Sequence, residues 1–375
     1  MKPWQFLLAA FAALALAGQA RRHAHVMPDG TGAARPPRVT QQRETLTIGS
    51  QSDDGPRAAV HEPGRGRLAD RPSEIPKLGW RDVLLRVKKQ IGEDNVSLTA
   101  SGVAYGWLLA VFPLLGSLIA IYGIVSDAAE VQRQVEGLFG LLSPQIVDML
   151  HDQLTKLTQA SETTLGFGAL FGILFSLWSA NSGTKSMIVA LNIVYSEKEK
   201  RGYFKLNFVS LSLTIGLVVA AIAALWLMVG VPILFRIIGM EDVVRGILDI
   251  ARWPVLAMAF MLGLSVLYRQ GPSREKPLWR WVTWGSAAAT LLWIAASGLF
   301  AFYVANFGKY DETYGSLGAV VILMLWFYIT AFIILLGAEL NAELEHQTAR
   351  DSTIHKSRPM GRRGAHMADT VGARQ

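Results

Sequence analysis

Six long apolar runs constrain this chain more than any other feature of its sequence. Each is nearly free of charge and approaches the roughly 20 residues that an α-helix needs to cross a hydrocarbon core of about 30 Å. Charged residues make up only 17% of the chain, below the roughly 25% that is usual in soluble domains. The pattern predicts an all-α membrane protein built as a six-helix transmembrane bundle. The predicted spans are 104–126, 165–195, 207–235, 253–268, 281–307 and 315–340.

The segments outside the spans have a different composition. Residues 21–76 hold seven of the 15 prolines, and such a segment buries too little apolar surface to offset its ordering entropy. We therefore expect 1–76 to be a disordered extension, 77–347 to be the membrane domain, and 348–375 to be a disordered basic cytoplasmic tail. The apolar stretch within 1–20 is short for a span, which leaves open a signal, an anchor or a segment outside the folded core.

Connections rich in basic residues alternate along the chain with connections that are not. The segment before the first span and the connections 196–206 and 269–280 are rich in Lys and Arg, whereas 127–164 is acidic. Lys and Arg next to spans stay in the cytoplasm, so both ends of the six-span core are predicted to be cytoplasmic. Topology and attraction to anionic lipid then explain the net charge of +7. We expect no nucleic-acid partner, because aromatic residues are not interleaved with the basic ones.

The acidic first connection is long enough to have structure of its own. Apolar residues recur at helical spacing on both sides of Ser143-Pro144, a pair typical of a helix start. We expect two amphipathic extracytoplasmic helices within 131–158, lying on the bilayer surface or capping the bundle.

The second span contains the most informative polar residues. On a continuous helix, Trp178, Asn181, Lys185 and Asn192 fall within an arc of roughly 60°. A lysine at membrane depth usually faces the bundle interior or water, so this face predicts a polar path or an anion-coordinating site. The alternative is that the membrane helix ends near Ala180 and that Lys185 extends to the cytoplasmic interface.

The end of the sixth span adds acidic groups. Glu339 and Glu343 lie one helical turn apart and could bind a cation or accept a hydrogen bond from Lys185; alternatively, the helix simply emerges here into the cytoplasm. The candidates for a polar path are Tyr105, Trp178, Asn181, Lys185, Asn192, Glu339 and Asn341.

Enzyme templates are poorly matched. The chain has no cysteine, which removes disulfides, thiolate catalysis and Cys-ligated metal sites. Its histidines all lie outside the predicted spans, and no His-Glu-x-x-His helix, phosphate-binding loop or nucleophile elbow appears. We therefore expect no catalytic residues, no metal, no cofactor and no enzymatic activity.

Three segments carry a resemblance to a known family. Residues 98–115 contain LTASGVAY and FPLL, residues 177–195 contain LWSA and ALNIVY, and residues 314–343 contain YGSLGA, LWFY and LGAELNAE. In this order and spacing the chain resembles the YihY/BrkB family of bacterial inner-membrane proteins, formerly labelled ribonuclease BN, over about residues 80–347. The resemblance implies a multi-pass protein of the bacterial inner membrane with six spans and both core ends in the cytoplasm.

The resemblance implies no mechanism, although members of the family have been proposed as transporters and linked to serum resistance. Our leading hypothesis is a transporter or exporter that acts on a lipid, an anion or another envelope solute. The alternative is a non-transporting scaffold or envelope-integrity factor, and a membrane ribonuclease comes third. The expected partners are the bilayer, with anionic lipid at the cytoplasmic face, and an unknown small solute or lipid; a homo-oligomer is also open.

Overall fold

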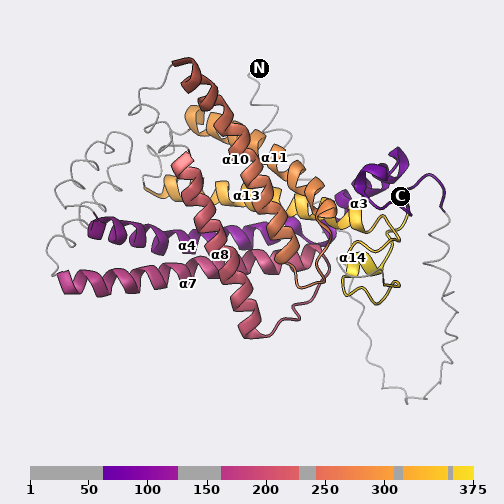
Figure 1. The fold of residues 1–375 in the computed structure, drawn as a ribbon, viewed down its shortest axis with the longest axis horizontal. Coiled ribbons are helices and arrows are strands. Elements are labelled where there is room, and N and C mark those ends of the chain that lie inside the picture. Colours follow the sequence, from indigo (N-terminus) through magenta and orange to yellow (C-terminus); the bar gives the residue numbers. More distant parts are fainter. Residues whose placement is uncertain (1–61, 126–161, 228–241, 308–315, 354–357) are drawn as a thin grey trace, which may run out of the picture. The chain divides into compact units, whose positions relative to one another are not determined.

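The computed structural model of the chain describes residues 62–125, 162–227, 242–307, 316–353 and 358–375. Within these ranges the secondary structure is helical, and the only extended pairing is an isolated bridge between Pro277 and Thr353. The long helices are α4 (Val96–Val125), α7 (Glu162–Val194), α8 (Tyr203–Leu225), α10 (Asp242–Gln270), α11 (Trp279–Phe307) and α13 (Ser316–Glu345) (Figure 1). The short ones are η1 (Pro72–Glu74), α3 (Lys77–Glu93) and α14 (His366–Asp369).

Each long helix overlaps one of the six predicted spans. Many of the large apolar side chains on these helices are exposed, among them Phe208, Leu262 and Leu299. Such a surface suits contact with lipid rather than water. Within the described residues, four helical segments are long and apolar enough to cross a membrane: Tyr203–Ala224, Ile250–Gln270, Trp279–Asn306 and Gly318–Glu345.

The second predicted span is one continuous helix. α7 runs without a break through the polar residues 181–186, so the helix does not end near Ala180. The hydroxyls of Thr184 and Ser186 donate to the carbonyl oxygens four residues earlier, which satisfies these side chains on the helix itself. With 33 residues, α7 is about 50 Å long at 1.5 Å per residue, well above a hydrocarbon thickness of about 30 Å.

The helices pack in a few close pairs. α4 lies along α7, and α13 packs against α4 and α11 (Figure 1). The α11–α13 contact depends on two facing glycines, since a Cβ on Gly285 would stand 2.0 Å from the carbonyl oxygen of Gly337. Only a residue without a side chain permits this approach of two backbones. The buried core includes Leu191, Tyr268 and Leu335.

The two flanking segments differ from the expected disorder wherever the structure describes them. Thr348 donates to the carbonyl oxygen of Ala69 at 2.7 Å, which ties the segment before α3 to the chain after α13. In the tail, Met367 is buried in the main core, and Arg363 donates to the carbonyl oxygens of Ala368 and Ala349 at 2.7 and 2.9 Å. Arginine and hydroxyl hydrogen bonds order these segments, and a criterion based on apolar burial does not detect them.

The basic connections meet the tail on one side of the helices. The backbone N–H of Lys200 donates to the Ser273 hydroxyl at 2.9 Å, and the Arg201 guanidinium donates to the Gly271 carbonyl at 2.8 Å. The backbone N–H of His366 donates to Glu197 at 2.7 Å. The amphipathic helices predicted within 131–158 and the apolar stretch within 1–20 lie outside the described residues.

Candidate functional site

A polar seam joins α7 to α8. Lys185 Nζ donates to Asn207 Oδ1 at 2.6 Å and lies 6.0 Å from the centroid of the Tyr203 ring. One residue before Lys185, the hydroxyl of Thr184 lies 2.7 Å from that of Thr214. We name Thr184, Lys185, Asn207 and Thr214 the α7–α8 seam. Its α8 residues lie within one of the four membrane-competent segments.

The other predicted residues of this α7 face do not share one environment. Asn181 is buried, and its Oδ1 has no hydrogen-bond partner among the described residues. By contrast, the side chain of Trp178 is 66% exposed and that of Tyr105 on α4 is 56% exposed. Tyr105 and Trp178 therefore lie on outward faces of their helices, and the structure does not bring them into the seam.

Asn192, at the end of α7, has a structural role. Its Nδ2 donates to Glu199 at 3.0 Å, and its Oδ1 accepts the backbone N–H of Ser273 at 2.7 Å. The side chain thereby holds both basic connections to α7. The Arg201 guanidinium beside Glu199 lowers the pKa of that carboxyl to about 2, because hydrogen bonds from a cation favour the ionised form.

Asn341 joins α13 to α11. Its Oδ1 accepts the backbone N–H of Gly285 at 2.7 Å, and its Nδ2 donates to the carbonyl oxygen of Val282 at 3.1 Å. The side chain is fully buried and both ends of the amide are used. Asn341 thus fixes the position of two helices and is not available to a solute.

The last turns of α13 bury three carboxylates. Glu345 receives two hydrogen bonds from Arg274 at 2.8 and 3.0 Å, with side-chain exposures of 0% and 1%. Glu343 forms an ion pair with Arg86 of α3. The sequence showed Arg86 and Arg274 only as part of the basic flanks, and the available signal was that Arg86 falls on the same face of α3 as Val83 and Val87.

Glu339 differs from both of its neighbours. It is 0% exposed, and neither of its carboxylate oxygens has a hydrogen-bond partner among the described residues. The predicted contact with Lys185 is not formed, since Lys185 bonds to Asn207. Glu339 instead lies within hydrogen-bonding reach of Asp94, from the connection between α3 and α4.

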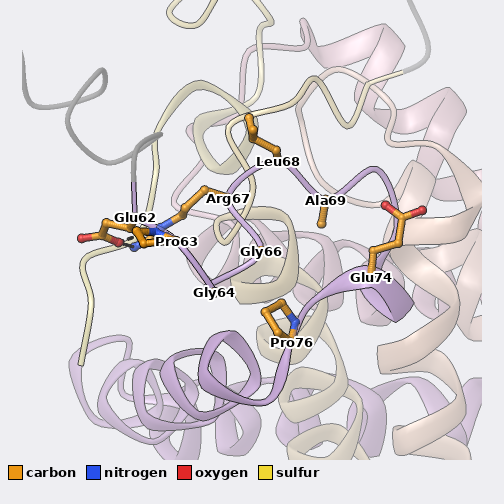
Figure 2. Close-up of a pocket in the computed structure, with 9 residues that line it drawn as sticks. All are labelled: Glu62, Pro63, Gly64, Gly66, Arg67, Leu68, Ala69, Glu74 and Pro76. Atoms are coloured by element: carbon orange, nitrogen blue, oxygen red, sulfur yellow. Dashed lines mark hydrogen bonds and ion pairs between the residues drawn. The ribbon is translucent and has the colours of Figure 1, made fainter.

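A surface hollow of about 400 Å³ lies elsewhere, at the segment before α3 (Figure 2). Arg67 and Glu62 line it and form an ion pair at 2.8 Å, and none of the predicted site residues contributes to it. In the part of the chain that the structure describes, no group of three or more His, Cys, Asp or Glu side chains is arranged to hold a metal ion.

Comparison with known proteins gives consistent matches. A family model described as virulence factor BrkB matches residues 87–361. The chain is 32% identical to a protein of Bacillus subtilis named ribonuclease-like protein YfkH, over 64% of this chain and 87% of that protein. It is 29% identical to a UPF0761 membrane protein of Vibrio parahaemolyticus, over 72% of this chain and 85% of the relative. No solved structure matches the chain.

Proposed function

The chain belongs to the virulence factor BrkB family, and on that premise we propose that it is a six-span inner-membrane transporter or exporter. Its solute carries negative charge, either as a lipid headgroup or as a free anion. The observation that carries this proposal is Lys185, a cation held between α7 and α8 with a neutral amide as its hydrogen-bond partner.

The argument from Lys185 is electrostatic. Lys185 lies toward the end of α7, and its partner Asn207 lies near the start of the membrane-competent segment Tyr203–Ala224. A lysine within a membrane segment usually pairs or faces a polar path. Among the described residues no carboxylate lies within ion-pair distance of Lys185. Asn207 accepts a hydrogen bond but does not neutralise the charge. The seam therefore keeps an attraction for an anion.

The topology in this proposal adds α4 and α7 to the four membrane-competent segments. Both are long enough, at 30 and 33 residues. The connection before α8, which holds Lys200, contacts the connection after α10, which holds Gly271. The first of these also contacts the tail, through Glu197 and His366. Because these connections are basic, we assign their side to the cytoplasm, which gives six spans with both core ends inside.

The test is transport by the purified full-length chain in liposomes. One arm follows a fluorescent phosphatidylglycerol by its accessibility to dithionite, and the other follows chloride and inorganic phosphate release. We expect one arm to exceed protein-free vesicles, and Lys185→Gln to reduce that flux about tenfold, equivalent to about 1.4 kcal/mol. Ser212→Ala is the matched control, because the exposed Ser212 hydroxyl donates to the Phe208 carbonyl of its own helix and to no other described residue.

Two results would overturn the proposal. Neither arm exceeding protein-free vesicles would remove transport of an anion. Full flux in the Lys185→Gln variant, at normal expression, would remove the seam from the mechanism.

We further propose that the chain is not an enzyme. The ribonuclease-like name belongs to the Bacillus relative, and RNA cleavage by the purified chain with added divalent metal would contradict this part of the proposal. A non-transporting scaffold is the competing function. It predicts that deletion of residues 131–158 leaves solute flux unchanged while an envelope phenotype appears.

A further inference from the structure

Glu339 and Asp94 form a carboxyl pair that nothing else in the described structure neutralises. Glu339 is fully buried near the end of α13, and both of its oxygens lack a donor. Asp94 lies within hydrogen-bonding reach of it. The Oδ2 of Asp94 is also buried without a partner, whereas its Oδ1 accepts a hydrogen bond from Gln90 at 3.2 Å.

The charged groups around the pair are already engaged. From α3, Arg86 binds Glu343 and also donates to Gln347 at 2.8 Å. Arg274 is committed to Glu345. Four other titratable groups lie near the pair. Glu343 is one turn from Glu339 on α13, and the Nδ1 of His346 lies 3.6 Å from Glu343. Glu93 pairs with Lys89, and the buried hydroxyl of Tyr195 has no partner among the described residues.

Two adjacent carboxylates in a buried site cannot both be ionised without a compensating charge. A hard metal cation is a poor candidate, because Ca²⁺ takes six to eight oxygen ligands and Mg²⁺ requires octahedral geometry. Among the described residues no group of three or more suitable side chains is present. A single proton needs only two oxygens, and it converts one carboxylate into a donor for the other.

We propose that Asp94 and Glu339 are a proton-binding site, in which one shared proton forms an O–H···O bond between the two carboxyl groups. Asp94 is half-buried and Glu339 is fully buried, so the proton reaches Glu339 from water through Asp94. Burial also raises the pKa of Asp94, which favours the protonated form. The assignment of this site as the proton input of a transport cycle rests on the proposed function, but proton binding itself does not.

The primary test is infrared spectroscopy of the full-length protein in detergent at neutral pH. We expect the carbonyl stretch of a protonated carboxylic acid in the unmodified protein and its loss in Glu339→Gln. In Asp94→Asn the band should shift in frequency, because the buried Glu339 keeps its proton but loses its carboxylate acceptor. Glu93→Gln is the matched control: Glu93 adjoins Asp94 in sequence but is 53% exposed and pairs with Lys89 at 3.3 Å. The control should keep the band.

Absence of the band at neutral pH, or an unchanged band in either variant, would overturn the proton site. Should Glu339→Gln fail to fold, Asp94→Asn and its Glu93→Gln control carry the test alone. A metal cation would be the occupant under a different result. In that case sodium chloride would raise the thermal stability of the unmodified protein more than choline chloride does, Asp94→Asn would lose this effect, and no acid band would appear. This result would also refute the proposal.

Flux measurements separate this proposal from the proposed function. We expect liposome flux in the unmodified protein to respond to a pH gradient, and Asp94→Asn to lose that response. An acid band without any flux would leave the proton site standing and overturn the transporter. The opposite result is loss of flux in Lys185→Gln together with an unchanged pH response of the flux in Asp94→Asn. It would support the transporter and overturn the role of the carboxyl pair in coupling.

Discussion

Replacing Gly285 with alanine tests the packing of α11 on α13. The new Cβ would stand 2.0 Å from the Gly337 carbonyl oxygen and 2.5 Å from Asn341 Cγ, whereas ordinary contact begins at 3.4 Å. The two helices must therefore separate by roughly 1 Å or more, beyond what packed cores absorb without strain. That shift also breaks the hydrogen bonds of Asn341 to Gly285 and Val282.

The magnitude follows from these two effects. Overpacking costs about 1–3 kcal/mol, and a buried amide that loses its partners costs about 1–3 kcal/mol more. The higher helix propensity of alanine returns at most about 1 kcal/mol. We expect Gly285→Ala to lower the free energy of unfolding by about 1–5 kcal/mol, with about 3 kcal/mol as the central value.

The assay is unfolding of the purified protein by sodium dodecyl sulfate in mixed micelles, followed by tryptophan fluorescence. Gly298→Ala, on the same helix, is the control, because a Cβ there meets no atom within 4 Å. It should be neutral or slightly stabilising. If Gly285→Ala and Gly298→Ala unfold within about 0.5 kcal/mol of each other, the ordinary range for surface substitutions, the close glycine contact is refuted.

Two further predictions concern charges outside the seam. Arg274→Met leaves Glu345 buried without its cation and should cost about 3–5 kcal/mol in the same unfolding assay, whereas adding Glu345→Leu should restore much of the loss; equal stability of the single and double variants would contradict a buried ion pair. Because the pKa of Glu199 is lowered from 4.5 to about 2, its ionised form should stabilise the fold above pH 4.5 and lose that contribution as the pH falls toward 2. Arg201→Gln should flatten this pH dependence in thermal unfolding, and an unchanged profile would show that Arg201 is not its cause.

The apolar pattern predicted the helices well and their boundaries less well. The span expected at 253–268 is part of α10, which begins at Asp242. The earlier turns lie outside the expected span because charged residues, Arg245, Asp249 and Arg252, interrupt their apolar run. α3 was missed for a related reason. Its basic residues were interpreted only as a topology signal, although Val83, Arg86 and Val87 fall on one buried face.

The candidate site shows where sequence reasoning stops. Lys185 was a candidate from the sequence, but its partner Asn207 lies on the next helix, and helix pairing is not contained in the spacing of one segment. Glu339 was identified for its position near the end of a span. Its neighbour Asp94 was not, because Asp94 comes before the first apolar run and is brought to Glu339 by the packing of α13 on α3 and α4.

The ion pair between Arg86 and Glu343 joins residues 257 positions apart. During synthesis, α3 leaves the ribosome long before its partner on α13 exists, so the nascent chain must insert most of its helices while the Arg86 guanidinium is still hydrated. The packing of α3 on α13 can therefore be completed only after α13 has been synthesised. The backbone N–H of Gln375 also donates to Asp82 of α3 at 3.2 Å, so α3 is held in place by two segments that are both synthesised long after it.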